Sequence, residues 1–189
     1  MPSVWQVLSQ DHEEVKKMLS ELEKGPTAGD ASEKELALRK KMAEQLVIEE
    51  SRHEAVEEMY FWPAVRDKLP DGDRLADTAT HQEQEGKEVL DKLDKLEAGQ
   101  PEFEQLLGQF TEDGREHIAF EETQVWPGLR EALSQQEANE LGDKLERAKK
   151  TAPTRPHPRT PPSPAALKAS GPAAGGADRL RDAATGRGE

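Results

Sequence analysis

One sequence pattern occurs twice in this chain, as HEAVEEMYFWP over residues 53–63 and as HIAFEETQVWP over residues 117–127. Both copies read H-x-x-x-E-E-x-x-x-W-P. Residues four positions apart on an α-helix stand one above the other, so His53 with Glu57, and His117 with Glu121, each present an imidazole and a carboxylate on one helix face. The repeat indicates an internally duplicated helical hairpin, which a bundle with pseudo-two-fold symmetry would explain.

Helical periodicity covers four long segments, at about residues 3–24, 31–69, 73–98 and 101–133. Gly- and Pro-containing turns separate them at 25–26, 69–72 and 99–101. Ser134, followed three residues later by Glu137, predicts a short fifth helix over about 134–149. Only 33% of the residues are apolar, which suits a bundle because each helix needs one apolar stripe. Residues 1–150 are therefore predicted to form an all-α, antiparallel, up-down four-helix bundle with a short fifth helix.

The composition changes after Thr151, and the remaining segment is rich in Pro, Ala, Gly and Arg. Such a segment has too little apolar surface to fold by itself. We therefore expect residues 151–189 to be a disordered tail, with at most one or two transient helical turns near 179–184. The tail is either a solvated appendage or an arm that binds a macromolecular partner, which the sequence does not identify.

The charge is unevenly distributed along the chain, whose net charge is −13. Six basic and three acidic side chains give residues 151–189 a charge of +3, which leaves −13 − 3 = −16 for residues 1–150. A body this acidic repels phosphate backbones, so no nucleic-acid binding is expected. There is no cysteine, and any metal would be bound by nitrogen and oxygen alone. No apolar run is long enough for a membrane span and no signal pattern is present, so we expect a cytoplasmic protein without a membrane partner.

Seven side chains are candidate metal ligands. A lone histidine on an apolar stripe is usually structural, and a lone H-x-x-x-E is commonly a solvated pair. However, the rise per residue along antiparallel helices puts four histidines and three carboxylates in one layer of the core. Three buried carboxylates without cations would be very costly, whereas two divalent cations would offset their charge. The predicted ligands are His12, His53, Glu57, His81, Glu85, His117 and Glu121.

Other residues near the repeats have less specific interpretations. Tyr60, the only tyrosine, either lines the metal pocket and donates a hydrogen bond to a bound oxygen species, or packs in the core. The two Trp-Pro pairs are expected to close one end of the bundle, each proline kinking its helix. Glu54, Glu58 and Glu122 are expected on solvated faces, although any of them could accept a hydrogen bond from a ligating imidazole, as Asp11 could from His12.

At these motifs the sequence resembles the HHE cation-binding, hemerythrin-like family, over about residues 3–133. The resemblance implies an antiparallel four-helix bundle around a non-haem di-iron centre, with two iron ions joined by an oxo or hydroxo bridge. Carried over to this sequence, Glu57 and Glu121 would bridge the irons, His12 and His53 would complete one iron that keeps an open position, and His81, Glu85 and His117 would serve the other.

Glu85 departs from the pattern of the oxygen-carrying hemerythrins, which have a histidine there. A third carboxylate stabilises the ferric state and disfavours reversible oxygen carriage. The resemblance therefore implies a di-iron protein that binds or reacts with a small oxidant, namely dioxygen, peroxide or nitric oxide, with an oxidoreductase activity left open. The alternatives are a non-catalytic oxygen or iron sensor, or an iron-sequestering module, signalling through the tail, and a purely structural bundle. Zinc or manganese in place of iron is also left open.

Overall fold

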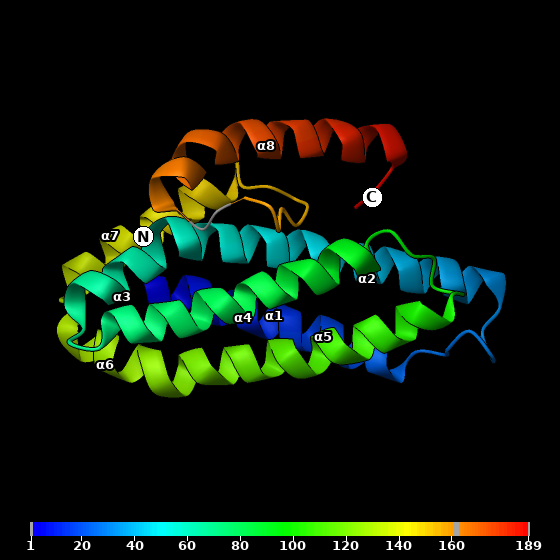
Figure 1. Cartoon of the computed structure of the whole chain (residues 1–189), viewed down its shortest axis with the longest axis horizontal. Coiled ribbons are helices and arrows are strands. Elements are labelled where there is room, and N and C mark those ends of the chain that lie inside the picture. The colour runs from blue at the N-terminus through cyan, green and yellow to red at the C-terminus, as the bar shows by residue number, and fades with distance from the viewer. Residues whose placement is uncertain (1, 161–162, 189) are drawn as a thin grey trace.

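The computed structural model describes residues 2–160 and 163–188, and Figure 1 shows its arrangement. Ten helical elements follow one another in the described part of the chain. They are α1 (Val4–Lys24), α2 (Glu33–Val56), η1 (Glu57–Phe61), α3 (Trp62–Lys68), α4 (Gly72–Leu93), α5 (Pro101–Phe120), η2 (Glu121–Val125), α6 (Trp126–Ala132), α7 (Gln135–Lys149) and α8 (Pro164–Thr185). The predicted bundle is confirmed: α1, α2–α3, α4 and α5–α6 form its four rods, and α7 is the expected fifth helix.

Side-chain caps fix where several of these helices begin. Ser32 accepts a hydrogen bond from the backbone N–H of Glu35, whose carboxylate returns to Ser32. Ser134 and Glu137 form the same capping box at the start of α7. At the turn between α3 and α4, Gly72 lies so close to the Val65 carbonyl that a Cβ atom would overlap it. These local rules agree with the predicted boundaries of the bundle.

The second and fourth rods each contain one π-helical segment, η1 and η2. The backbone N–H of Trp62 donates to the carbonyl of Glu57, and that of Trp126 donates to the carbonyl of Glu121, five residues back in both cases. The following residues, Pro63 and Pro127, have no N–H, and their rings would clash with the carbonyl four residues earlier. The wider turn accommodates the ring. Where the sequence predicted simple kinks, the structure therefore has π-bulges, which often occur at functional sites.

The apolar core is divided into two clusters. One contains the first turns of α1 with residues of η1, α3, α6 and α7. The other contains the second half of α1, the middle of α2, and residues of α4 and α5. Along α1, buried His12 lies between Leu8 of the first cluster and Val15 of the second. The polar layer described below therefore lies between two apolar layers that hold the rods together.

The prediction of a disordered tail is wrong for the described part of residues 151–189. Helix α8 packs on η1 and lies along the outer side of α2 (Figure 1). Ion pairs and hydrogen bonds anchor the segment: Arg187 contacts Asp94 and Asp182, and the Thr154 hydroxyl donates to Asp182. Composition alone counts apolar surface and misses such polar anchoring. Among the described residues, no helix is both long and apolar enough to span a membrane.

Candidate metal centre

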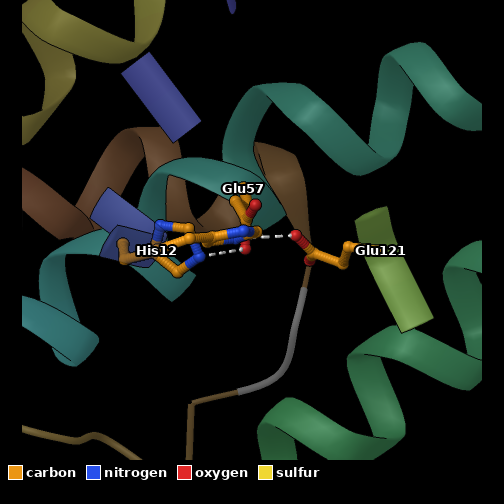
Figure 2. Close-up of side chains that lie close together, drawn as sticks. His12, Glu57 and Glu121 are labelled. Atoms are coloured by element: carbon orange, nitrogen blue, oxygen red, sulfur yellow. Dashed lines mark ion pairs between the residues drawn. The ribbon is translucent and has the colours of Figure 1, made fainter. Parts of the chain in front are cut away.

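Two groups of metal-ligating side chains meet in the layer between the apolar clusters. One group is His12, His53, Glu57 and Glu121, and the other is Glu57, Glu83, His117 and Glu121. Within each group, one ligand atom from every residue lies within 4.8 Å of the others. Figure 2 shows His12, Glu57 and Glu121 pointing toward one another from different rods. Glu57 and Glu121 belong to both groups, so the two groups form one continuous site.

The ligand atoms have no hydrogen-bond partner within the described part of the chain. This holds for Nε2 of the three histidines and for both carboxylate oxygens of Glu57 and Glu121. Glu57 and Glu121 are 0% exposed. The Nε2 atoms of His12 and His117 lie 3.1 and 3.2 Å from oxygens of Glu121, and Nε2 of His53 lies 3.1 Å from Glu57. Buried nitrogen and oxygen atoms that converge without hydrogen-bonding to one another fit a site for cations.

The other nitrogen of each imidazole is held from outside the cluster. Nδ1 of His53 lies 3.3 Å from Asp11 Oδ2, and Nδ1 of His117 lies 3.0 Å from Gln82 Oε1. A hydrogen bond from Nδ1–H leaves the lone pair of Nε2 free to face the centre. Asp11, expected beside His12, thus supports His53, and it is itself paired with the ammonium of Lys149.

His12 is held by two further contacts. Its Nδ1 lies 3.0 Å from Glu122 Oε1, which also accepts a hydrogen bond from Lys16 at 2.8 Å. Its ring stacks on Trp126, with ring centroids 5.0 Å apart and an interplanar angle of 16°. Glu122 therefore takes the hydrogen-bonding role that the sequence left open, and the Trp-Pro motif supports the site directly.

The structure contradicts the prediction that His81 and Glu85 are ligands. Their side chains are 73% and 65% exposed, and they form a solvated pair with Nδ1 and Oε2 3.2 Å apart. The buried face of α4 instead carries Ala76, Ala79 and Gly86. Two residues along an α-helix correspond to a rotation of about 200°, so a helix that buries position 83 must turn positions 81 and 85 toward solvent.

Glu83 is the site residue that the sequence interpretation missed. It is 2% exposed, its Oε1 accepts a hydrogen bond from the indole N–H of Trp62, and its Oε2 has no hydrogen-bond partner among the described residues. Burial and the nearby carboxylate of Glu58 raise its pKa well above the usual range. The available signal was the small-residue stripe of Ala76, Ala79 and Gly86, which places position 83 on the packed face of α4.

Tyr60 lies in η1 and is half-buried. It packs against the first apolar cluster, and the ammonium of Lys168 in α8 lies 4.5 Å from the centre of its ring. Of the two roles considered for Tyr60, the structure supports packing. Tyr60 is not among the residues that line the cleft described below, and its role in orienting a bound oxygen species stays a prediction.

The buried acids and imidazoles of the site shift one another's pKa values. Burial raises the pKa of Glu57, and repulsion from Glu121 raises it further. Burial alone would lower the pKa of His53 and His117. The carboxylates of Glu57 and Asp11 outweigh it and raise the pKa of His53, and those of Glu121 and Glu57 raise the pKa of His117. Protons on these groups therefore supply positive charge that bound cations would otherwise provide.

A cleft of about 470 Å³ leads from the surface to this layer. It lies between residues of α1, α2, α4 and α5, and four of the six ligands line it: His12, His53, Glu83 and His117. A cation or a small molecule can therefore reach the site from the side of α4 and α5.

Fold and site together define a class of protein: a helical bundle with a buried histidine–carboxylate site suited to cations. The sequence profile of the hemerythrin HHE cation binding domain matches residues 3–129. The chain therefore belongs to the hemerythrin HHE cation-binding family, and the family resemblance of the duplicated motif is confirmed.

One relative and one solved structure are similar to this chain. The chain is 34% identical, over 139 residues, to an uncharacterized hemerythrin-like protein of Schizosaccharomyces pombe, a match that covers 73% of this chain and 68% of the relative. The fold of this chain is similar to the crystal structure of a hemerythrin HHE cation binding domain-containing protein from Mycobacterium kansasii, with a TM-score of 0.63 and 21% identity. That comparison covers 89% of this chain and 99% of the other, and it supports the fold alone.

Proposed function

We propose that the protein holds two iron ions in the buried layer, with Glu57 and Glu121 shared between them. His12 and His53 would complete the ligands of one ion, and Glu83 and His117 those of the other. The observation that carries the proposal is the membership of Glu57 and Glu121 in both ligand groups, with all four of their oxygens buried and without hydrogen-bond partners. The three carboxylates supply a charge of −3, which two divalent ions offset. The nitrogen and oxygen donors suit iron, and also suit zinc or manganese.

We further propose that the loaded protein binds or reacts with a small oxidant: dioxygen, peroxide or nitric oxide. Bound iron would supply one-electron chemistry and an open position for such a molecule. The chain contributes the cleft, which admits a small molecule past His12, His53 and His117. Glu83, in place of Glu85, is the third carboxylate of this site. A third carboxylate favours the ferric state and disfavours reversible oxygen carriage. The cytoplasmic location and the absence of nucleic-acid and membrane partners stay predictions.

The reaction is tested by adding hydrogen peroxide to the iron-loaded protein while following the visible absorption bands and oxygen release. We expect the bands to change and peroxide to be consumed. The zinc-loaded protein is the control, because it has the same fold without redox chemistry. An unchanged spectrum together with an unchanged peroxide concentration would rule out this reaction.

A second candidate function is a non-catalytic sensor of oxygen or iron. It is favoured by one observation: α8 packs directly on η1, the segment that carries Glu57. A change at the metal site could therefore alter how the C-terminal segment is held. Limited proteolysis of the metal-free and loaded forms tests this alternative, which requires that cleavage within residues 151–188 depends on the metal.

A further inference from the structure

The cleft to the metal layer is strongly acidic at its mouth. Four exposed carboxylates line it there, Glu85, Glu88, Asp113 and Glu116, against the single ammonium of Lys92. Exposed acids of this kind are frequent on surfaces and do not by themselves define a site. They do give the mouth a negative potential, which concentrates cations and repels anions.

Deeper in the cleft, two carboxylates are buried. Glu50 and Glu54 stand one turn apart on α2, on either side of His53, and both line the cleft. Glu50 is 7% exposed and Glu54 is 4% exposed. Neither belongs to the two ligand groups of the centre. The Oε2 atom of Glu54 has no hydrogen-bond partner among the described residues, and no hydrogen bond or ion pair joins Glu50 to any of them.

The nearby protein cation is too heavily shared to balance these acids. Lys87 is buried, and its ammonium donates to Glu58 at 2.6 Å. Glu54 and Glu83 make no hydrogen bond with this ammonium, but together with Glu58 they raise the pKa of Lys87, so one positive charge serves three buried carboxylates. The inner cleft therefore contains more carboxylates than protein cations in a region of low dielectric, where an unpaired carboxylate is costly unless it keeps a proton or gains a cation. A cation from outside can take the place of such a proton.

We propose that Glu50 and Glu54 form a transit site, at which a divalent cation is held between the acidic mouth and the metal centre. This inference rests on the proposed metal binding. Carboxylate oxygens replace part of the water shell of a hard cation, and His53, His117 and Glu83 line the same cleft and take the ion next. Two carboxylates bind a cation more weakly than the full ligand set of the centre does, so the ion moves on. A site on a transport path has to release its ion in this way.

The test compares cation loading of the full-length protein after its metal has been removed with a chelator. The double variant Glu50→Gln/Glu54→Gln removes both carboxylates with little change in volume. The control Glu131→Gln/Glu140→Gln makes the same two chemical changes outside the cleft lining, at exposed positions of α6 and α7. Co²⁺ is mixed with each protein in a stopped-flow instrument, and its visible absorption reports the rate and the final stoichiometry. Circular dichroism confirms that each protein is helical.

The transit site predicts that the double variant loads Co²⁺ about tenfold more slowly than the control at low salt, since electrostatic steering contributes factors of this size. The final stoichiometry should remain two per chain, and the rate should depend less on salt than in the wild type. If the double variant does not fold, the single variants Glu50→Gln and Glu54→Gln should each load more slowly than the control.

Two results would overturn the inference while leaving the proposed function intact. One is a loading rate equal to that of the control, and the other is a final stoichiometry below two, which would make Glu50 or Glu54 a ligand of the centre itself. A wild-type protein that takes up no Co²⁺ would instead refute the metal site on which the inference rests. The three outcomes are therefore distinguishable in one set of measurements.

Discussion

At the scale of single residues, Glu83 and His81 make opposite predictions about metal binding. Glu83 is buried in the second ligand group, and one of its carboxylate oxygens has no hydrogen-bond partner among the described residues, whereas His81 is 73% exposed. The variant Glu83→Gln should lower the affinity for the second metal ion by at least about tenfold. Even a residue that only orients a metal ligand has an effect of this size when it is replaced. His81→Ala should leave both ions bound. Elemental analysis after equilibrium dialysis measures both variants.

One pair of results would contradict this assignment of ligands on α4. If His81→Ala lost an ion while Glu83→Gln kept two, α4 would have to be rotated relative to the structure. The variant Glu85→Gln serves as the matched control for Glu83→Gln, since it makes the same chemical change at a neighbouring exposed position of α4.

The hydrogen bond behind His53 gives a second prediction. Burial opposes ionisation of Asp11, but His53 and Lys149 outweigh it and lower the Asp11 pKa. A charged Asp11 fixes Nδ1–H of His53 and makes Nε2 a better ligand. Asp11→Asn should therefore lower metal affinity about 10–100-fold without removing a ligand. A competitive chelator titration measures this, and an affinity unchanged in Asp11→Asn would show that Asp11 has only a structural role.

The pH dependence of the metal-free protein follows from Glu54. Burial, with repulsion from Glu50 and Glu58, raises the pKa of Glu54 to about 8 from its ordinary value of 4.5. The folded state thus binds this proton more tightly than the unfolded state does. The resulting stability is fully present below pH 4.5 and is lost as the pH rises through about 8. Urea unfolding should show this decline, which Glu54→Gln should flatten and which bound cations, by displacing the proton, should also reduce.

Five of the seven ligands predicted from the sequence lie in the two groups. The i,i+4 spacing of the duplicated motif fixes four of them on one face of each rod, and the apolar stripe of α1 places the fifth. His12, His53, Glu57, His117 and Glu121 are those residues. The remaining pair was misplaced for a physical reason. The prediction placed the face of α4 that carries His81 in the core. The structure buries the face that carries small side chains, because these allow close packing against the other rods. The hydrogen bonds behind the histidines join separate rods, and spacing along one helix does not predict such contacts.

At the scale of elements, the π-bulges connect the Trp-Pro pairs to the metal ligands. Each bulge begins at a ligand, Glu57 or Glu121, and ends just before Trp62 or Trp126. The prolines were recognised in the sequence as helix breakers, but a widened turn and a kink have the same sequence signature. The prolines that follow these bulges therefore shape the metal site and at the same time lower the stability of the helices that carry it.

Replacing Pro127 tests this connection. An alanine there supplies an N–H and removes the ring, so regular α-helical bonding becomes available over residues 121–127. Pro127→Ala should raise the stability of the metal-free protein by up to about 3 kcal/mol. It should also weaken metal binding by about tenfold or more, because Glu121 and the Trp126–His12 stack would shift. Thermal melting and chelator competition measure the two effects.

The control for this prediction is Pro101→Ala. Pro101 occupies the first turn of α5, where proline is well tolerated. This variant should change neither stability nor affinity by more than about 0.5 kcal/mol. Metal affinity that stays at the wild-type level in Pro127→Ala would show that the bulge is not required for the site.

At the scale of the whole molecule, the C-terminal segment adds a layer to a bundle that already contains every ligand. Deleting residues 151–189 should leave two metal ions bound. It should lower stability by about 2 kcal/mol, or roughly 4–8 °C in melting temperature, because the deletion removes the buried Leu167 and exposes part of Met59 in the same apolar cluster. Arg187→Gln, which removes the pairs with Asp94 and Asp182, should produce part of that loss. Metal loss on deletion would contradict the division of roles between bundle and tail.

The central claim is a pair of metal ions between Glu57 and Glu121, and anomalous X-ray scattering tests it most directly. Crystals of the iron-loaded protein, measured at the iron absorption edge, should show two peaks roughly 3.5–4 Å apart, as in other two-metal sites. One peak should contact His12 and His53, the other should contact Glu83 and His117, and both should contact Glu57 and Glu121. A single peak, no peak in this layer, or a peak at His81 and Glu85 would contradict the account.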